Sequence, residues 1–433
     1  MKTKSLFNSA SWTTVQWIIF ITAIVILMFL TVGLKGQTII FDHGTIDRIA
    51  NEYVGMKQNR ALVIGVIKNG QKNIYVYGET EKGNKVKPDT NSIFELGQMS
   101  EVFTTSLLAI LEAQGKISSQ QEVRDVLKGV VKMPYYQRFI CRKTTPNFSP
   151  SEGFRPAITE CFPDPYATPQ AIIICDLASH SAGLPPEPPI GLFSGKNPFK
   201  DYTLNKLNTY VSKLNPNESF GYEYQYSMTG MAILGEAMSY KMKMSYDALL
   251  KEKILDPLGM RYTFITPNAE QEKLFLIGHN SKGNITSHND YNALTPAAGI
   301  RSSATDLLTF LDANLNYTTD LSKALNETHV PHVFSTYNSP KFTVSWGWIQ
   351  VSLDNNDPKN SKKMIWQCGE RGGFSTFMAF VIESKTAVVI LSNTNNSVDD
   401  LGKKIIKSLE NLENKTAAVD LINLNTTKKQ KNE

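Results

Sequence analysis

A long uncharged stretch near the N-terminus constrains this chain more than any other feature. Residues Trp17–Leu34 carry no charged side chain, and at about 1.5 Å per residue a helix of this length nearly spans a ~30 Å hydrocarbon core. Lysines lie on both sides, with a small excess on the N-terminal side, which favours an N-terminus in the cytoplasm. The alternative is a cleaved signal peptide, but the stretch is long for one and no small-x-small site follows it. We expect a tail over residues 1–14, an anchor over 15–34 and a body outside the cytoplasm.

Composition limits what the body can be. With 433 residues, of which 41% are hydrophobic and 20% charged, the chain can bury a full core. A net charge of +5 without a cluster of Lys and Arg in the body excludes the basic footprint of a nucleic-acid binder. No motif for a cofactor and no convincing set of zinc ligands is present. The 4 cysteines are too few for a disulfide scaffold, but Cys141 and Cys161 flank a loop and can pair outside the cytoplasm.

Strand and helix signals are strongest at the two ends of the body. Leu62–Ile67 and Ile74–Tyr77 flank Asn69-Gly70, a pattern typical of a β-hairpin. Helices are predicted within residues 35–60, over 102–113 and from about 397 to 412. Late strands are predicted at Thr343–Val351, Lys363–Gln367, Ser375–Ile382 and Thr386–Leu391.

These elements suggest one domain over residues 35–413, followed by a polar tail over 414–433. We expect the hairpin and the late strands to share an antiparallel sheet, with the first and last helices covering one face. The helical middle of the chain would form a second lobe. A long irregular stretch at about 133–170 reads as an insertion.

A series of motifs runs through this domain in a fixed order. It comprises FELGQMSEVFTTSLLAILEAQGKI (94–117), DLASHSAGLP (176–185), YEYQYSMTGMAILGEAM (222–238), DPLGM (256–260), PAAGIRSSATDLLTFL (296–311), SWGWIQV (345–351) and GERGGFSTFMAFV (369–381). In this order and spacing the chain resembles the serine β-lactamase-related family, which includes penicillin-binding proteins, class C β-lactamases, D-Ala-D-Ala carboxypeptidases and esterases. The resemblance implies an α/β (α+β) fold: an antiparallel sheet with flanking helices, an all-helical lobe, and the active site between them.

The resemblance also implies a catalytic Ser-x-x-Lys motif, which this chain lacks. In the family a Ser attacks a carbonyl and a Lys one helical turn later activates it. The matching quartet here is Gln98-Met99-Ser100-Glu101, with an amide at the nucleophile position and an acid at the lysine position. No Lys anywhere in the chain has a Ser three residues before it. The serine mechanism is therefore not available at this position.

The two remaining family motifs are also altered. Tyr226-Ser227-Met228 keeps the tyrosine of Tyr-x-Asn but loses the amide. Glu370-Arg371-Gly372 stands where a Lys/His-x-Gly strand is expected. By resemblance, backbone N–H groups of Gln98 and Gly373 would form the oxyanion pocket. We therefore regard Gln98, Tyr226, Arg371 and Gly373 as the residues that line the ligand cleft.

Glu101 and Arg371 carry opposite charges and would both face this cleft. One hypothesis is that they form an ion pair in the space of the missing lysine. The alternative is that each faces water or another neighbour.

The altered motifs predict a catalytically inactive protein whose cleft binds a peptide, a peptidoglycan-like ligand or a protein partner. The alternative is a working hydrolase with a non-standard nucleophile: Ser100, Cys368, or a water activated by Glu101 or Glu370. A third possibility is a structural anchor whose cleft is closed.

Overall fold

The computed structural model describes most of the body of the chain. The described ranges are 43–136, 139–143, 147–149, 153–155, 159–163, 170–190, 197–214, 223–334, 342–354 and 361–411. The expected anchor over 15–34 and the tails over 1–14 and 414–433 lie outside them. Within these ranges, no helix is both long and apolar enough to span a bilayer.

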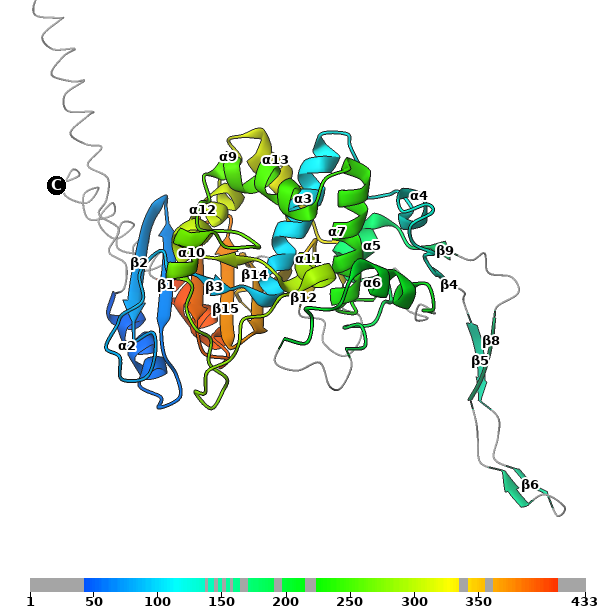
Figure 1. The fold of residues 1–433 in the computed structure, drawn as a ribbon, viewed down its shortest axis with the longest axis horizontal. Coiled ribbons are helices and arrows are strands. Elements are labelled where there is room, and N and C mark those ends of the chain that lie inside the picture. The colour runs from blue at the N-terminus through cyan, green and yellow to red at the C-terminus, as the bar shows by residue number, and fades with distance from the viewer. Residues whose placement is uncertain are drawn as a thin grey trace, which may run out of the picture. The chain divides into compact units, whose positions relative to one another are not determined.

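An eight-stranded antiparallel sheet joins the two ends of the body (Figure 1). Its strand order is β11-β12-β13-β14-β15-β16-β1-β2. The strands are β1 (Leu62–Lys68), β2 (Gln71–Tyr77), β11 (Val333–Phe334), β12 (Phe342–Val344), β13 (Ile349–Ser352), β14 (Lys363–Arg371), β15 (Phe374–Val381) and β16 (Thr386–Ser392). β1 pairs with β16, so that Leu62 lies opposite Ser392. The predicted sharing of one sheet by the hairpin and the late strands is confirmed.

Local backbone geometry explains both the β1–β2 hairpin and a division of one predicted strand into two. Asn69 and Gly70 have φ values of 48° and 80°, which is the pattern of the type I′ turn that Asn-Gly favours. The single strand predicted over Thr343–Val351 is wrong, because it is two strands, β12 and β13. Gly347, at φ 71°, turns the chain between them, and its N–H donates to the carbonyl of Ala178 at 3.1 Å.

Helices cover both faces of the sheet. α2 (His43–Val54) is tied to β16 by the Tyr53 hydroxyl, which donates to Ser392 Oγ at 3.0 Å. The helix over residues 399–411 packs so closely that a Cβ at Gly402 would collide with the Phe377 ring. α12 (Ala304–Leu315) packs on the other side, where Leu308 lies against Gly65. β15 and β16 are buried along their whole length, with apolar side chains on both faces of the sheet.

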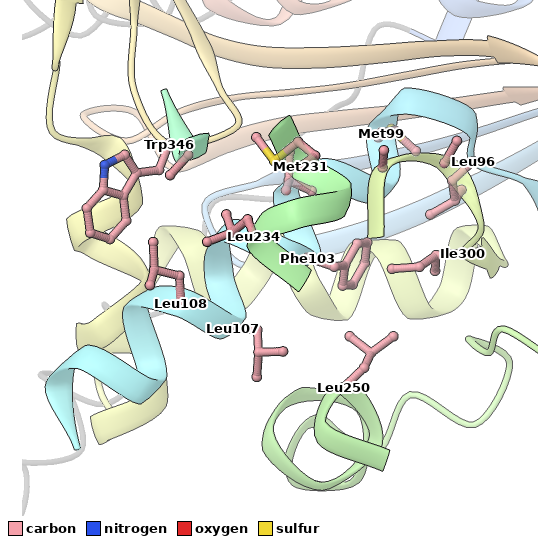
Figure 2. Close-up of a cluster of buried hydrophobic side chains, with 14 of the residues drawn as sticks. Leu96, Met99, Phe103, Leu107, Leu108, Met231, Leu234, Leu250, Ile300 and Trp346 are labelled. Carbon is pink, nitrogen blue, oxygen red and sulfur yellow. The ribbon is translucent and has the colours of Figure 1, made fainter. Parts of the chain in front are cut away.

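The helical lobe is built around α3 (Glu101–Ala113), which is buried on nearly all sides as its apolar sequence predicts. Figure 2 shows Phe103, Leu107 and Leu108 of α3 among side chains from α7 (Met228–Met242) and from the loops near Ile300 and Trp346. The other helices are α4 (Val123–Val126), α5 (Ile174–Ala178), α6 (Leu204–Val211), α8 (Tyr246–Leu250), α9 (Asp256–Leu258), α10 (Ala269–Leu274), α11 (Thr295–Ala298) and α13 (Asp320–Leu325). A short pair, β3 (Phe94–Glu95) with β10 (Arg301–Ser302), precedes the site.

The expectation that residues 133–170 are irregular is wrong, because this stretch contains short paired strands. The pairs are β4 (Tyr135–Tyr136) with β9 (Gln170–Ala171), β5 (Phe139–Lys143) with β8 (Thr159–Pro163), and β6 (Asn147–Ser149) with β7 (Gly153–Arg155). Backbone hydrogen bonds pair these short strands, and the amino-acid composition of the stretch did not reveal this pairing. The β5–β8 register places Cys141 opposite Cys161. Their side chains lie outside the description, so the disulfide stays a prediction.

Candidate functional site

The quartet Gln98-Met99-Ser100-Glu101 lies where a 3₁₀ turn, Gly97–Ser100, leads into α3. The side chains of Met99, Ser100 and Glu101 are fully buried, and Gln98 alone is partly exposed. Ser100 Oγ accepts a hydrogen bond from the Ile300 backbone N–H at 3.0 Å. A buried hydroxyl that is engaged in this way cannot reach a substrate.

Glu101 is the centre of a buried hydrogen-bond network. Its Oε1 accepts from the Tyr226 hydroxyl at 2.9 Å, and its Oε2 lies 3.1 Å from His180 Nε2. The Ser227 backbone N–H points at His180 Nδ1, at 3.1 Å. Because a backbone N–H can only donate, Nδ1 holds a lone pair and the ring hydrogen is on Nε2. His180 therefore donates to Glu101, and the buried carboxylate is satisfied by two donors.

This network changes the chemistry available to Tyr226. Burial, and then the negative charge of Glu101, raise the pKa of the Tyr226 hydroxyl well above 10. A lysine at position 101 would act in the opposite direction, since a nearby cation favours the phenolate. The hydroxyl stays protonated and donates to Glu101, so Tyr226 cannot act as a general base. The exchange of lysine for glutamate thus removes the base as well as the cation.

The side chain of Gln98 is hydrogen-bonded to a backbone N–H of strand β14. Its Oε1 accepts a hydrogen bond from the Glu370 backbone N–H at 3.0 Å. An oxyanion pocket needs backbone N–H groups that are free to meet a substrate oxygen. The Glu370 N–H is bonded to the Gln98 side chain, so it is not free to meet a ligand oxygen beside the nucleophile position.

The part of β14 that lies against the 3₁₀ turn is Gln367-Cys368-Gly369, three residues before the expected segment Glu370-Arg371-Gly372. A Cβ at Gly369 would collide with the Leu96 carbonyl and lie 3.0 Å from Gln98 N, so only glycine allows this approach. Gly373 lies instead in the β14–β15 turn, where its carbonyl accepts from His279 N at 3.0 Å. The glycine of the Lys/His-x-Gly pattern is thus best matched by Gly369. This places Gln367, a neutral amide, at the basic position.

Of the two hypotheses for Glu101 and Arg371, the direct ion pair is not found, and each residue meets another neighbour. Arg371 pairs with Glu187, on the loop after α5, and its guanidinium carbon lies 5.9 Å from the centre of the Phe199 ring. Both oxygens of Glu101 are already engaged, and its charge acts on Arg371 only through space.

The remaining candidates are placed as follows. Met228 is fully buried at the start of α7. Cys368 is half-buried, and burial followed by the charge of Asp399 raises the pKa of its thiol, which makes it a poor nucleophile. Glu370 is exposed at the end of β14. Within the described ranges, no group of three or more His, Cys, Asp or Glu side chains is arranged to hold a metal ion.

The comparisons with known proteins agree with this architecture. A family model described as Beta-lactamase matches residues 46–410. The chain belongs to the β-lactamase family. A β-lactamase of Providencia stuartii is 24% identical over 80% of this chain and 86% of its own length. The D-alanyl-D-alanine-carboxypeptidase/endopeptidase AmpH of Escherichia coli K12 is 22% identical over 83% and 89%. The β-lactamase/D-alanine carboxypeptidase structure from Pseudomonas syringae superimposes with a TM-score of 0.64 at 20% identity, covering 86% of this chain and 98% of that one.

Within this β-lactamase fold, sequence reasoning missed three residues of the site. His180 reads as structural, Glu187 lies in a Pro-rich loop, and Gln367 precedes the segment that we took as the third motif. A buried acid at Glu101 was the available signal, because a carboxylate inside the α3 core requires donors from other parts of the chain.

Proposed function

We propose that this β-lactamase-family protein is a catalytically inactive, membrane-anchored member that acts as a ligand- or partner-binding module. The observation that carries the proposal is the Glu101 network: the lysine position holds a buried acid that Tyr226 and His180 both satisfy. A network satisfied in this way is a stable arrangement in its own right. Loss of the nucleophile of a serine hydrolase lowers turnover on the order of 10⁶-fold.

Three further placements argue against the alternative of a non-standard nucleophile. Ser100 is buried and bonded to Ile300 N, the Cys368 thiol has a raised pKa, and the Glu101 carboxylate is buried away from water. Glu370 is exposed, but its own backbone N–H is held by Gln98 at 3.0 Å. This N–H is therefore not free to bind the oxygen of a carbonyl that a water activated by the Glu370 carboxylate would attack.

The ligand class follows from the cleft residues and from the family. Arg371 uses its terminal nitrogen on Glu187 and has a buried Nε without a hydrogen-bond partner. Together with Tyr226 and Gln98 it would receive a peptide, a peptidoglycan-like ligand or a segment of a protein partner. The relatives named carboxypeptidase and β-lactamase support a peptide-like ligand. The uncharged stretch Trp17–Leu34 supports a single-pass anchor with the body outside the cytoplasm.

Mass spectrometry of the purified full-length protein tests the loss of chemistry. We expect no covalent adduct after incubation with a fluorophosphonate probe or with penicillin, while an active class C β-lactamase treated in parallel is labelled. A stoichiometric adduct on any side chain contradicts the proposal and identifies the working nucleophile. Thermal shift with penicillin and with a peptide ending in D-Ala-D-Ala tests the binding. A saturable shift that Arg371→Gln abolishes supports a module, and no shift with either probe supports the structural-anchor alternative.

A further inference from the structure

One cavity of the described part of the chain lies where α2 ends and the chain leaves β2. Its volume is about 390 Å³. Three cationic side chains line it, those of Arg60, Lys85 and Lys87, with a single acid, Glu79. An excess of positive charge around a cavity of this size favours an anionic ligand.

Arg60 is the buried component of this cavity, with 6% of its surface exposed. Its NH1 donates to the carbonyls of Lys57 and Asn59 at 2.9 and 2.8 Å, and its NH2 lies 3.3 Å from the carbonyl of Gly283. Nε is buried without a hydrogen-bond partner. Among the residues that the structure describes, no carboxylate forms an ion pair with this guanidinium. The carbonyls therefore fix its position but leave its charge without an ion-pair partner, which is costly for a buried ion.

Glu79 offsets only part of the positive charge, because it is one acid beside three cations and its carboxylate oxygens are bonded to the loop that follows β2. Glu79 Oε1 accepts from the Gly83 N–H at 2.5 Å, and Oε2 accepts from the Lys85 N–H at 3.3 Å. These hydrogen bonds, the Gly83 bond first, lower the pKa of Glu79, and the charge of Arg60 adds only a smaller effect across space. The carboxylate thus shapes the loop that presents Lys85 and Lys87. Within the described ranges, neither lysine has an ion-pair partner.

We propose that this cavity binds a phosphate-type oxyanion through Arg60, Lys85 and Lys87. Arg supplies directional N–H donors and Lys supplies a mobile point charge, a combination suited to tetrahedral oxyanions. A phosphate monoester or a lipid head group fits the volume as well as free phosphate does. The proposed anchor makes a head group available, because only residues 35–42 separate it from α2, at most about 30 Å of chain.

Thermal unfolding of the full-length protein in a non-ionic detergent tests the site. Sodium phosphate should raise the unfolding temperature saturably, relative to sodium chloride at equal ionic strength. The Lys85→Ala/Lys87→Ala double variant should bind phosphate at least about tenfold more weakly, since two of the three cations are gone. Lys82→Ala is the matched control, because Lys82 is exposed in the same loop but does not line the cavity. Absence of a phosphate effect in the wild type, or equal loss in the Lys82 variant, overturns the proposal.

A second measurement identifies the source of the oxyanion. The same titration is repeated with the full-length protein in nanodiscs of phosphatidylcholine with and without phosphatidylglycerol. If a head group occupies the site, the lipid stabilises the wild type more than the double variant and free phosphate adds nothing. If the ligand is a soluble phosphate, its effect in nanodiscs equals that in detergent. The detergent experiment does not depend on the proposed cleft function, so the two proposals can fail separately.

Discussion

Tyr226→Phe is the sharpest test of the Glu101 network. The substitution removes one hydroxyl and keeps the ring, which packs 4.9 Å from the His180 ring between centroids. The lost bond is an O–H donor at 2.9 Å from a buried carboxylate. Hydrogen bonds to charged groups contribute about 1.5–3 kcal/mol, and Glu101 would keep only the His180 donor. We expect the free energy of unfolding to fall by about 2 kcal/mol.

Tyr224→Phe provides a matched control two residues away. Tyr224 also packs against His180, edge to face with ring centroids 5.8 Å apart, but its hydroxyl makes no hydrogen bond to Glu101. We expect a change of less than about 0.5 kcal/mol. Urea unfolding followed by tryptophan fluorescence measures both variants. A double-mutant cycle with Glu101→Gln should give a coupling energy of about 1–2 kcal/mol for Tyr226 and about zero for Tyr224. Equal destabilisation by the two Tyr→Phe changes refutes the network as the feature that holds Glu101.

Three further perturbations have defined outcomes. Burial raises the pKa of Asp306 to about 6 from 3.8, so the folded state binds the extra proton and stability falls as pH rises from about 4 to 6, by about 3 kcal/mol in total. Asp306→Asn should remove this pH dependence from denaturation curves, and parallel curves for variant and wild type would contradict it. Ser227→Ala removes the N-cap of α7, whose Oγ accepts from Gly230 N at 2.9 Å, and should lower stability by about 1 kcal/mol in the same assay. Arg371→Met should cost less than about 1 kcal/mol, since its pair with Glu187 is partly exposed; a loss of 3 kcal/mol would show that Arg371 stabilises Glu101 after all.

Sequence patterns predicted the parts of the fold that depend on local geometry. The Asn-Gly turn, α3 and strands β14 to β16 are all found close to their expected positions, because backbone preferences and apolar period act over a few residues. The expected strand over Thr343–Val351 failed at Gly347, which has a positive φ, donates to the Ala178 carbonyl and lies close to Thr105 of α3. A glycine inside an apolar run does not reveal which distant group it must approach.

The motifs did not reveal the contacts of the candidate site. Tyr226 is bonded to Glu101 and Gln98 is bonded to the Glu370 N–H, whereas the third segment was assigned three residues too late. That error arose because Glu370-Arg371-Gly372 and Gln367-Cys368-Gly369 both end in glycine. Only the close approach of Gly369 to the Gln98 backbone distinguishes them.

The sequence by itself determined that the Ser-x-x-Lys motif is absent, since no Lys in the chain has a Ser three residues before it. Tertiary structure alone decided what replaced it. Glu101 bonds to His180 and Tyr226, which follow it by 79 and 125 positions, and Arg371 pairs with Glu187, 184 positions before it. The physical reason is that a buried charge needs hydrogen-bond donors, and these come from segments that are distant in sequence but close in space. Which segments lie close is set by the packing of the sheet and the helical lobe, and local sequence does not encode it.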